Sequence, residues 1–270
     1  MSATTGPATP GAAAPGGAPA AGSAPAPAVR RIAAQAAFEA RMILRNGEQI
    51  LVAVVVPVLA LVGLVRGTFV ELDTDGLSRV DYLTPGVLAL AVMTASFTSQ
   101  AIATAFDRRN GVLRLMATTP LGRGGLLAGK VIGVLAVEAV QVVLIGAAAL
   151  ALGWRPDPAG VLPALVGVVL GTGAFTALAL LVAGTLRAEA VLALANLLLL
   201  VLALGGGVIV AAERLPGPLA TIAAWLPSGA LGDVLRGALH DGTLPLLPAL
   251  VLAGWTVLIG ALAARWFRWH

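Results

Sequence analysis

The stretch Phe106–Lys130, FDRRNGVLRLMATTPLGRGGLLAGK, decides the fold because it separates two long apolar runs. Leu83–Ala105 comes before it, and Val131–Leu152 follows it. Each run is long enough to cross a bilayer, which takes about 20 apolar residues. Between them we expect a short helix over Gly111–Thr119, which ends there because Pro120 lacks an amide donor and disfavours helix at the residue before it. The sequence therefore predicts a short helix suspended between two membrane spans.

This short helix combines an apolar side with basic neighbours. Its apolar residues are Val112, Leu113, Leu115 and Met116, and the basic residues beside them are Arg108, Arg109 and Arg114. An apolar centre with a charged rim is typical of a protein interface. Lipid headgroups are the alternative partner for such an amphipathic helix. We predict that all four apolar side chains are exposed and dock in a groove of another protein.

Composition makes this a membrane protein. The 270 residues are 59% hydrophobic and 11% charged, and the mean hydropathy is +0.95, whereas soluble domains are roughly 25% charged. The net charge is only +4, and the basic residues gather at the ends of the apolar runs, so we expect no nucleic-acid partner. The absence of cysteine excludes disulfides and thiol chemistry, and the two distant histidines disfavour a histidine-based metal site. We expect no cofactor.

We predict six membrane spans, preceded by an interfacial helix. Met1–Ala28 is rich in Ala, Pro and Gly and is expected to be a disordered tail, so the membrane domain covers residues 29–270. Val29–Gln49 has an apolar side and an arginine side, which predicts a helix lying on the membrane surface; a soluble helical tail is the alternative. The expected spans are Ile50–Val65 with a kink at Pro57, Leu83–Ala105, Leu126–Leu152, Val161–Leu186, Val191–Ala211 and Leu244–Arg265.

The distribution of basic residues predicts the orientation. With the N-terminus inside, twelve of the 17 Lys and Arg residues lie in inner segments. The positive-inside rule therefore places both termini in the cytoplasm, and we expect a multi-pass protein of the plasma membrane. Outside, Leu219–Leu226 and Gly229–Leu239 are apolar runs too short to cross, separated at Pro227. They predict re-entrant helices before the sixth span, with an apolar loop packed on the protein as the alternative.

Polar residues within the spans are candidates for a translocation pathway. Glu138 is the one carboxylate deep inside a predicted span, and Gln141 shares its helix face. The alternative is that Glu138 only ties its span to a neighbour, for which Asn196 is a candidate. Gln100 ends a polar stripe on the second span, although Ser and Thr in such stripes often bond their own helix. Lys130 is expected to extend toward the cytoplasmic interface.

Two sequence patterns do not indicate a chemical site. Gly124–Lys130, GGLLAGK, is close to a phosphate-binding loop, but Val131 stands where Ser or Thr should hold magnesium, and no strand precedes it. Glycines at four-residue spacing, namely Gly125, Gly129, Gly133 and the pair Gly167 and Gly171, predict close helix packing. No nucleophile and base occur at an interpretable spacing, so we expect no enzyme activity in this chain.

The stretch Asp81–Lys130, DYLTPGVLALAVMTASFTSQAIATAFDRRNGVLRLMATTPLGRGGLLAGK, resembles the permease subunits of ABC-2 type exporters. The resemblance is closest to their daunorubicin-resistance-like, actinobacterial branch. It rests on LTPG, the charged DRR turn, GVLR, TPL and the GK that enters the third span. Further matches are LRAEAVLALANLLLL at Leu186–Leu200 and RLPGPLATIAAWLPSGALGDVLRGAL at Arg214–Leu239, which follows the glycines Gly205–Gly207.

The resemblance covers about residues 30–265 and implies an all-α membrane domain with specific partners. It implies six spans, an N-terminal elbow helix, a cytoplasmic coupling helix over Arg108–Thr119 and re-entrant helices before the sixth span. It also implies a separate ATP-binding subunit, a second permease copy and export of an apolar or amphipathic substrate. Two alternatives remain: a proton-coupled secondary transporter that uses Glu138, and a membrane assembly scaffold that does not transport.

Overall fold

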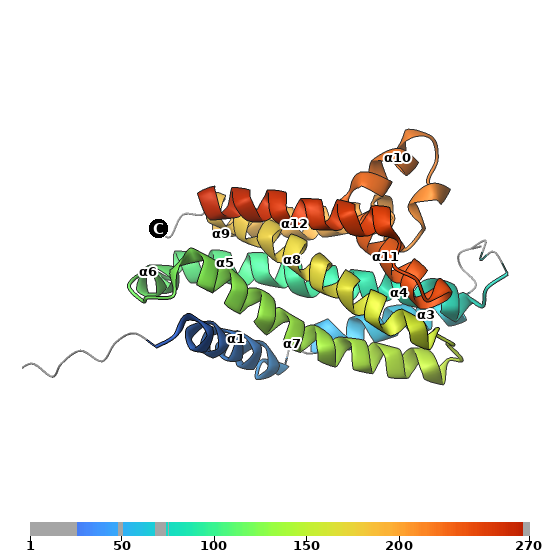
Figure 1. The fold of residues 1–270 in the computed structure, drawn as a ribbon, viewed down its shortest axis with the longest axis horizontal. Helices are drawn as coiled ribbons and strands as arrows, with labels where there is room; N and C mark the ends of the chain where they lie inside the picture. The colour runs from blue at the N-terminus through green and yellow to red at the C-terminus, as the bar shows by residue number, and fades with distance from the viewer. Residues whose placement is uncertain (1–25, 48–50, 68–73, 75, 267–270) are drawn as a thin grey trace, which may run out of the picture.

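The computed structural model describes residues 26–47, 51–67, 74 and 76–266, and these residues form helices and loops without a strand (Figure 1). The elements are α1 (Ala28–Leu44), η1 (Leu51–Val55), α3 (Val56–Arg66), α4 (Arg79–Met93), η2 (Thr94–Ser99), α5 (Gln100–Arg109), α6 (Val112–Ala117), α7 (Gly122–Ala151), η3 (Pro158–Gly160), α8 (Val161–Thr185), α9 (Ala188–Gly205), η4 (Ala212–Arg214), α10 (Pro218–Trp225), α11 (Pro227–Asp241) and α12 (Leu246–Trp266). The predicted tail falls outside the described residues, apart from its last three.

Five of the helical segments are long and apolar enough to cross a membrane. They are Arg79–Arg109, Gly124–Ala151, Pro158–Thr185, Ala188–Gly205 and Leu246–Trp266. The predicted first span corresponds to a shorter apolar helix, Ala53–Arg66. Its residue Pro57 is at the start of α3, directly after the π-helical turn η1, so its missing amide leaves one backbone bond unmade within this helical segment. The structure therefore supports a multi-pass membrane protein.

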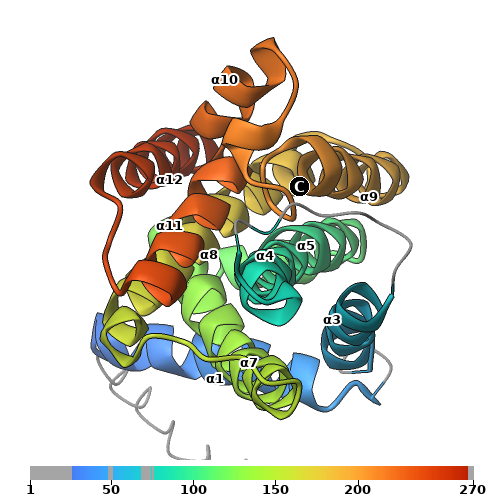
Figure 2. The same cartoon turned by 90° about the vertical axis from the view of Figure 1, so that its right-hand side faces the viewer.

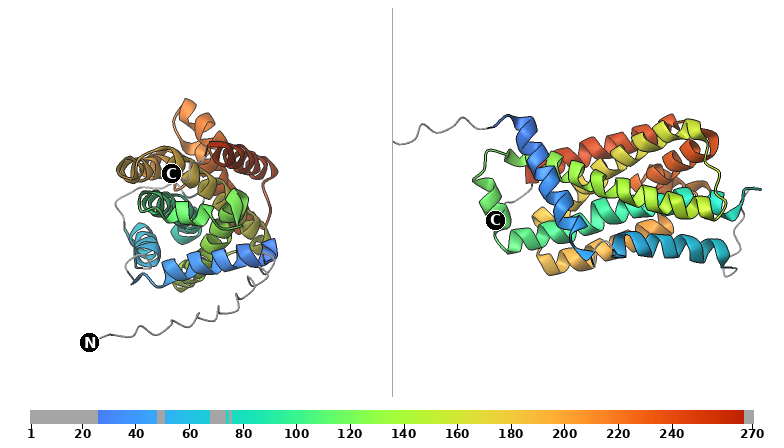
Figure 3. Two further views of the ribbon diagram at one scale, coloured as in Figure 1. Left: turned by 90° about the vertical axis from the view of Figure 1, so that its left-hand side faces the viewer. Right: turned by 90° about the horizontal axis from the view of Figure 1, so that it is seen from below.

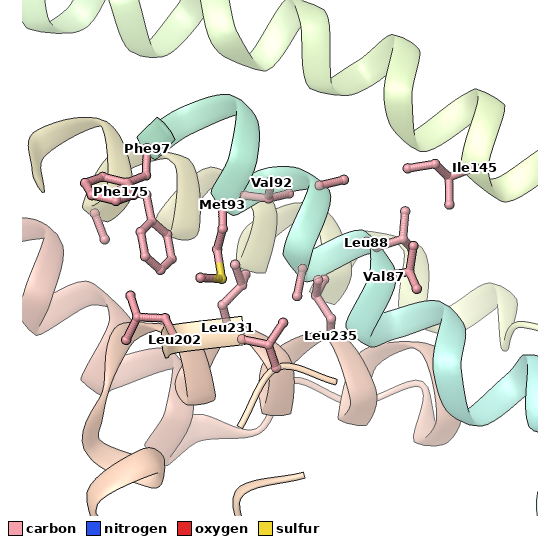
Figure 4. Close-up of a cluster of buried hydrophobic side chains, with 14 of the residues drawn as sticks. Val87, Leu88, Val92, Met93, Phe97, Ile145, Phe175, Leu202, Leu231 and Leu235 are labelled. Carbon is pink, nitrogen blue, oxygen red and sulfur yellow. The ribbon is translucent and has the colours of Figure 1, made fainter. Parts of the chain in front are cut away.

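The segment Arg79–Arg109 is the centre of the bundle. It consists of α4, the π-helical η2 and α5, and the end view shows it enclosed by the other long helices (Figure 2). Phe97 and Met93 on this segment are fully buried, and they point toward Phe175 of α8 and Leu231 of α11 (Figure 4). Thr94 and Ser96 donate to carbonyls one turn earlier in their own helix, as expected for hydroxyls in an apolar interior.

Helix α1 crosses α7 at one end of the bundle (Figure 3). The glycines at four-residue spacing make this approach possible. A Cβ atom on Gly129 would lie 2.5 Å from Cγ of Gln35, and one on Gly133 would lie 2.7 Å from Cβ of Glu39. The close packing predicted from this spacing is confirmed, and its partner is α1.

The segment before α12 is a pair of helices that meet at Pro227. Helix α10 ends at Trp225, and α11 begins at Pro227, so the predicted break is confirmed. Helix α11 packs on α8, where a Cβ on Gly167 would lie 2.5 Å from Cγ1 of Val234. The alternative of an ordinary apolar loop is wrong for this segment, because its residues are helical and α11 is buried between α4, α8 and α12.

Several predicted boundaries need correction, among them the end of the surface helix, which is at Leu44 rather than Gln49. The fifth span was expected to reach Ala211, but α9 ends at Gly205. The glycines that follow allow the chain to turn, and Gly207 has a positive φ of 77°. The buried backbone carbonyls beyond the end of α9 are satisfied from α11, because Ser228 Oγ donates to the Gly206 carbonyl (3.0 Å) and Arg236 donates to the Gly207 carbonyl (3.0 Å). At the other end of the bundle, α7 begins at Gly122, four residues before the predicted Leu126.

Candidate functional site

Helix α6 projects from one end of the bundle between α5 and α7 (Figure 1). It begins after Gly111, whose φ of 77° lies in the left-handed region that favours glycine, so the chain can reverse direction between Arg109 and Val112. It ends at Ala117, two residues before the predicted Thr119 and three before Pro120. The short helix expected from the sequence is therefore present between two long helices.

The four apolar residues of α6 do not form one exposed face, which corrects the prediction from the sequence. Leu115 is 71% exposed, whereas Leu113 is fully buried. Leu113 packs in a small cluster with Leu126 of α7, Leu180 of α8 and Ala263 of α12. Val112 and Met116 are half-buried, and Met116 lies against the same cluster. The helix thus has one side anchored in the bundle and one side, centred on Leu115, free for a partner.

The basic residues around α6 divide into two groups. Arg108 donates to the Leu186 carbonyl, and Arg109 Nη1 forms an ion pair with Glu189 Oε1 at 2.7 Å. These contacts fasten the end of α5 to the start of α9. Arg114 is exposed on α6, and Thr119 is exposed with its hydroxyl donating to the Met116 carbonyl (2.7 Å). Arg114 therefore shares the free side of the helix with Leu115, and Arg108 and Arg109 belong to the bundle.

A buried ion cluster lies directly behind this site. Lys130 of α7 is fully buried, and its Nζ lies 2.9 Å from Glu39 Oε1 of α1 and 4.0 Å from Asp107 Oδ2 of α5. Gln100 Oε1 is 3.5 Å from the same Nζ, and Gln35 donates to Glu39 at 2.9 Å. The expectation that Lys130 extends to the interface is wrong, because two carboxylates hold its ammonium group inside the bundle.

The cluster also explains the glycine-lysine sequence that resembles a phosphate-binding loop. Gly124–Lys130 is part of the continuous helix α7, so after the first helical turn its backbone amides are committed to helical bonds rather than directed at a phosphate. Gly129 seats α1, and Lys130 neutralises Glu39. The sequence did contain a signal for the pairing: Glu39 lies on the apolar stripe of its helix, between Ala36 and Ile43, where a charge needs a partner.

Glu138 joins α7 to α8. Its Oε2 accepts a hydrogen bond from Thr172 Oγ1 at 2.5 Å, and within the described part of the chain its Oε1 has no hydrogen-bond partner. Gln141, one turn further, donates to the Ala53 carbonyl at 2.6 Å. Asn196 is not the partner suggested by the sequence, because it is exposed on α9 and donates to the Leu192 carbonyl of its own helix (2.8 Å). The four candidate pathway residues are therefore not one cluster.

Chemistry that requires a metal has no donor set among the described residues, where no three His, Cys, Asp or Glu side chains gather to hold an ion. The side chains around α6 connect it and its neighbouring helices. Arg109 connects α5 to α9, and Lys130 connects α7 to α5 and α1. Leu113 packs α6 against α7, α8 and α12.

Comparison with known proteins identifies the family of this chain. No curated protein matches the chain. The model of the ABC-2 family transporter protein matches residues 68–265, which is more than half of the chain and includes α4 to α11 and nearly all of α12. The matched region contains α6 and both helices that flank it. The chain therefore belongs to the ABC-2 family of transporter proteins.

Proposed function

We propose that this chain is the permease subunit of an ATP-driven exporter, in the daunorubicin-resistance-like branch of its family. A separate ATP-binding subunit hydrolyses ATP, and two permease copies form the pathway in the plasma membrane. The main support for this proposal is that Leu115 and Arg114 lie on the free side of α6, whereas Leu113 anchors its other side in the bundle. A partner that moves α6 would act at once on α7, α8 and α12.

The substrate class follows from the surfaces available for a pathway. The spans carry mainly apolar side chains, with isolated polar groups such as Gln141 and Gln100. We propose an apolar or amphipathic substrate, such as a drug, a lipid, a haem-like molecule or a lipid-linked glycan. The ion cluster and α1 contribute rigidity at the inner end, with α1 acting as an elbow helix on the membrane surface. Helices α10 and α11 act as the re-entrant pair at the outer end.

The topology makes the first prediction. A reporter fused after Gly122 or His270 should report a cytoplasmic location, and one fused after Asp75 or Asp241 should report the outside. The physical reason is the excess of arginine in the inner segments. Paired alkaline phosphatase and fluorescent-protein fusions measure this directly. A cytoplasmic signal after Asp75 would contradict six spans with both termini inside.

Glu138 supports a second candidate function. A buried carboxylate oxygen that has no hydrogen-bond partner among the described residues can carry a proton, which favours a proton-coupled secondary transporter. Glu138→Gln keeps the shape and can still accept the bond from Thr172 through its carbonyl oxygen. In an ATP-driven exporter, transport by this variant should stay dependent on ATP and insensitive to a proton gradient.

The control for this second prediction is Thr172→Val, which removes the hydroxyl but keeps the carboxyl group. If Glu138 is only a packing residue, both variants should insert normally and transport at a similar rate. Uptake by purified permease vesicles driven by a proton gradient alone, and lost in Glu138→Gln, would establish the secondary transporter and contradict the ATP-driven proposal.

A further inference from the structure

A basic cleft opens between the end of α5 and the start of α9. It has a volume of about 370 Å³ and is lined by Ala105, Arg108, Arg109, Thr185, Arg187, Ala188 and Glu189. Three arginines and one glutamate leave the cleft with two positive charges. Arg109 and Glu189 pair with each other, and both side chains are largely exposed. The cleft is therefore an accessible and positively charged surface.

The donors of this cleft suit a phosphate group. Arginine presents several N–H groups in a planar fork that matches phosphate oxygens. Arg187 is exposed at the position preceding α9, and no side chain caps the first turn of that helix. A helix N-terminus has free amide groups and partial positive charge, so it adds to the attraction of the arginines for an anion.

The position of the cleft selects a lipid over a soluble anion. It lies where two membrane-crossing segments, Arg79–Arg109 and Ala188–Gly205, reach the same end of the bundle. One turn along α9 the surface becomes apolar, starting with Leu192 at 44% exposed and continuing through Leu197 and Leu200. A phospholipid would place its phosphate at the arginines and its acyl chains on these leucines, whereas an acidic protein segment would match the arginines alone.

We propose that this cleft binds the headgroup of an anionic phospholipid. Basic pockets between membrane helices at the cytoplasmic surface are suited to such headgroups. Glu189 competes with the phosphate for Arg109, so it limits the affinity of the cleft. The bound lipid would connect the end of α5, which leads into α6, with the start of α9. This binding site is independent of whether the chain exports a substrate.

The test uses the full-length chain in detergent, titrated with tail-labelled phosphatidylglycerol. Wild-type protein should bind it saturably and should bind tail-labelled phosphatidylcholine at least about tenfold more weakly. The double variant R108Q/R187Q should lose about tenfold or more in affinity for phosphatidylglycerol. The matched control R155Q changes an exposed arginine in the α7–α8 connection and should bind like the wild type.

Glu189→Gln gives the opposite expectation and keeps the test decisive if the double variant does not fold. Because it removes the competing carboxylate, it should bind phosphatidylglycerol several-fold more tightly than the wild type. Wild-type affinity in a folded R108Q/R187Q, or no tightening in E189Q, would overturn the proposal. Displacement of the labelled lipid by millimolar inorganic phosphate would overturn it in favour of a soluble anion site. If R108Q/R187Q loses a protein partner but still binds phosphatidylglycerol like the wild type, the proposal is overturned in favour of a docking surface.

Discussion

Replacing Lys130 by methionine should destabilise the chain by about 3–5 kcal/mol, because it leaves the buried Glu39 carboxylate without its counter-charge. Lys130 is fully buried, and the Glu39 side chain beside it is 2% exposed. The methionine fills nearly the same volume, so the loss reports on charge rather than on packing. The expected result is a large drop in the unfolding temperature of the purified protein in detergent, with the sharpest loss of protection from proteolysis in α1.

The matched control is the double variant K130M/E39Q. It removes both charges of the closest pair, and replacing a whole buried pair costs much less than removing one partner. The double variant should therefore recover a large part of the stability that K130M loses. Wild-type unfolding in K130M, or a double variant no more stable than the single one, would show that the ion cluster does not hold α1 against α7.

Leu115→Asp should abolish co-purification of the ATP-binding subunit while the permease itself stays folded. Leu115 is 71% exposed, so a charge there costs the isolated chain little. In a docked complex the same charge would be buried in an apolar groove. Burial of a leucine contributes about 1.5–3 kcal/mol, so its loss alone weakens binding by at least about tenfold. The measurement is the amount of ATP-binding subunit and of ATP hydrolysis retained on the tagged permease.

The control for this prediction is Leu113→Ala, two residues away on the same helix. It removes side-chain volume from the cluster with Leu126 and Leu180, so it should lower the stability of the permease by about 2–5 kcal/mol. At permissive temperature it should still bind the partner. Leu113 and Leu115 thus separate stability from docking, which a simultaneous substitution of both residues could not do. Normal partner binding by Leu115→Asp would show that α6 has no docking role.

Much of the fold was predictable from the sequence because membrane spans are long apolar runs with sharp charged ends. The bundle, the break at Pro227 and the helix before Pro120 follow from chain-local chemistry. The early end of α9 does not follow from local sequence, because the apolar run continues beyond it. Gly206 and Gly207 let the chain turn out of the helix, and Arg236 binds the Gly207 carbonyl there.

The candidate site was predictable in place but not in detail. An amphipathic pattern shows that Leu113 and Leu115 are apolar, but only tertiary contacts decide which of them is covered. The residues that cover Leu113 come from α7, α8 and α12, and the most distant of them in sequence is Ala263. The prediction for Lys130 was wrong for the same reason. A lysine near the end of a span reaches the interface unless a carboxylate that is distant in sequence lies closer, and here Glu39 does.

The docking of α6 on an ATP-binding subunit is the central claim, and one labelling measurement tests it most directly. The chain has no cysteine, so Leu115→Cys introduces a single thiol. Labelling by a membrane-impermeant maleimide is compared for the permease alone and for the permease with its ATP-binding subunit. Val143→Cys, on the apolar face of the membrane-crossing helix α7, is the negative control and should stay unlabelled in both samples. The account predicts that Leu115→Cys is labelled readily in the isolated permease and is protected in the complex. Equal labelling of Leu115→Cys with and without the subunit would contradict it.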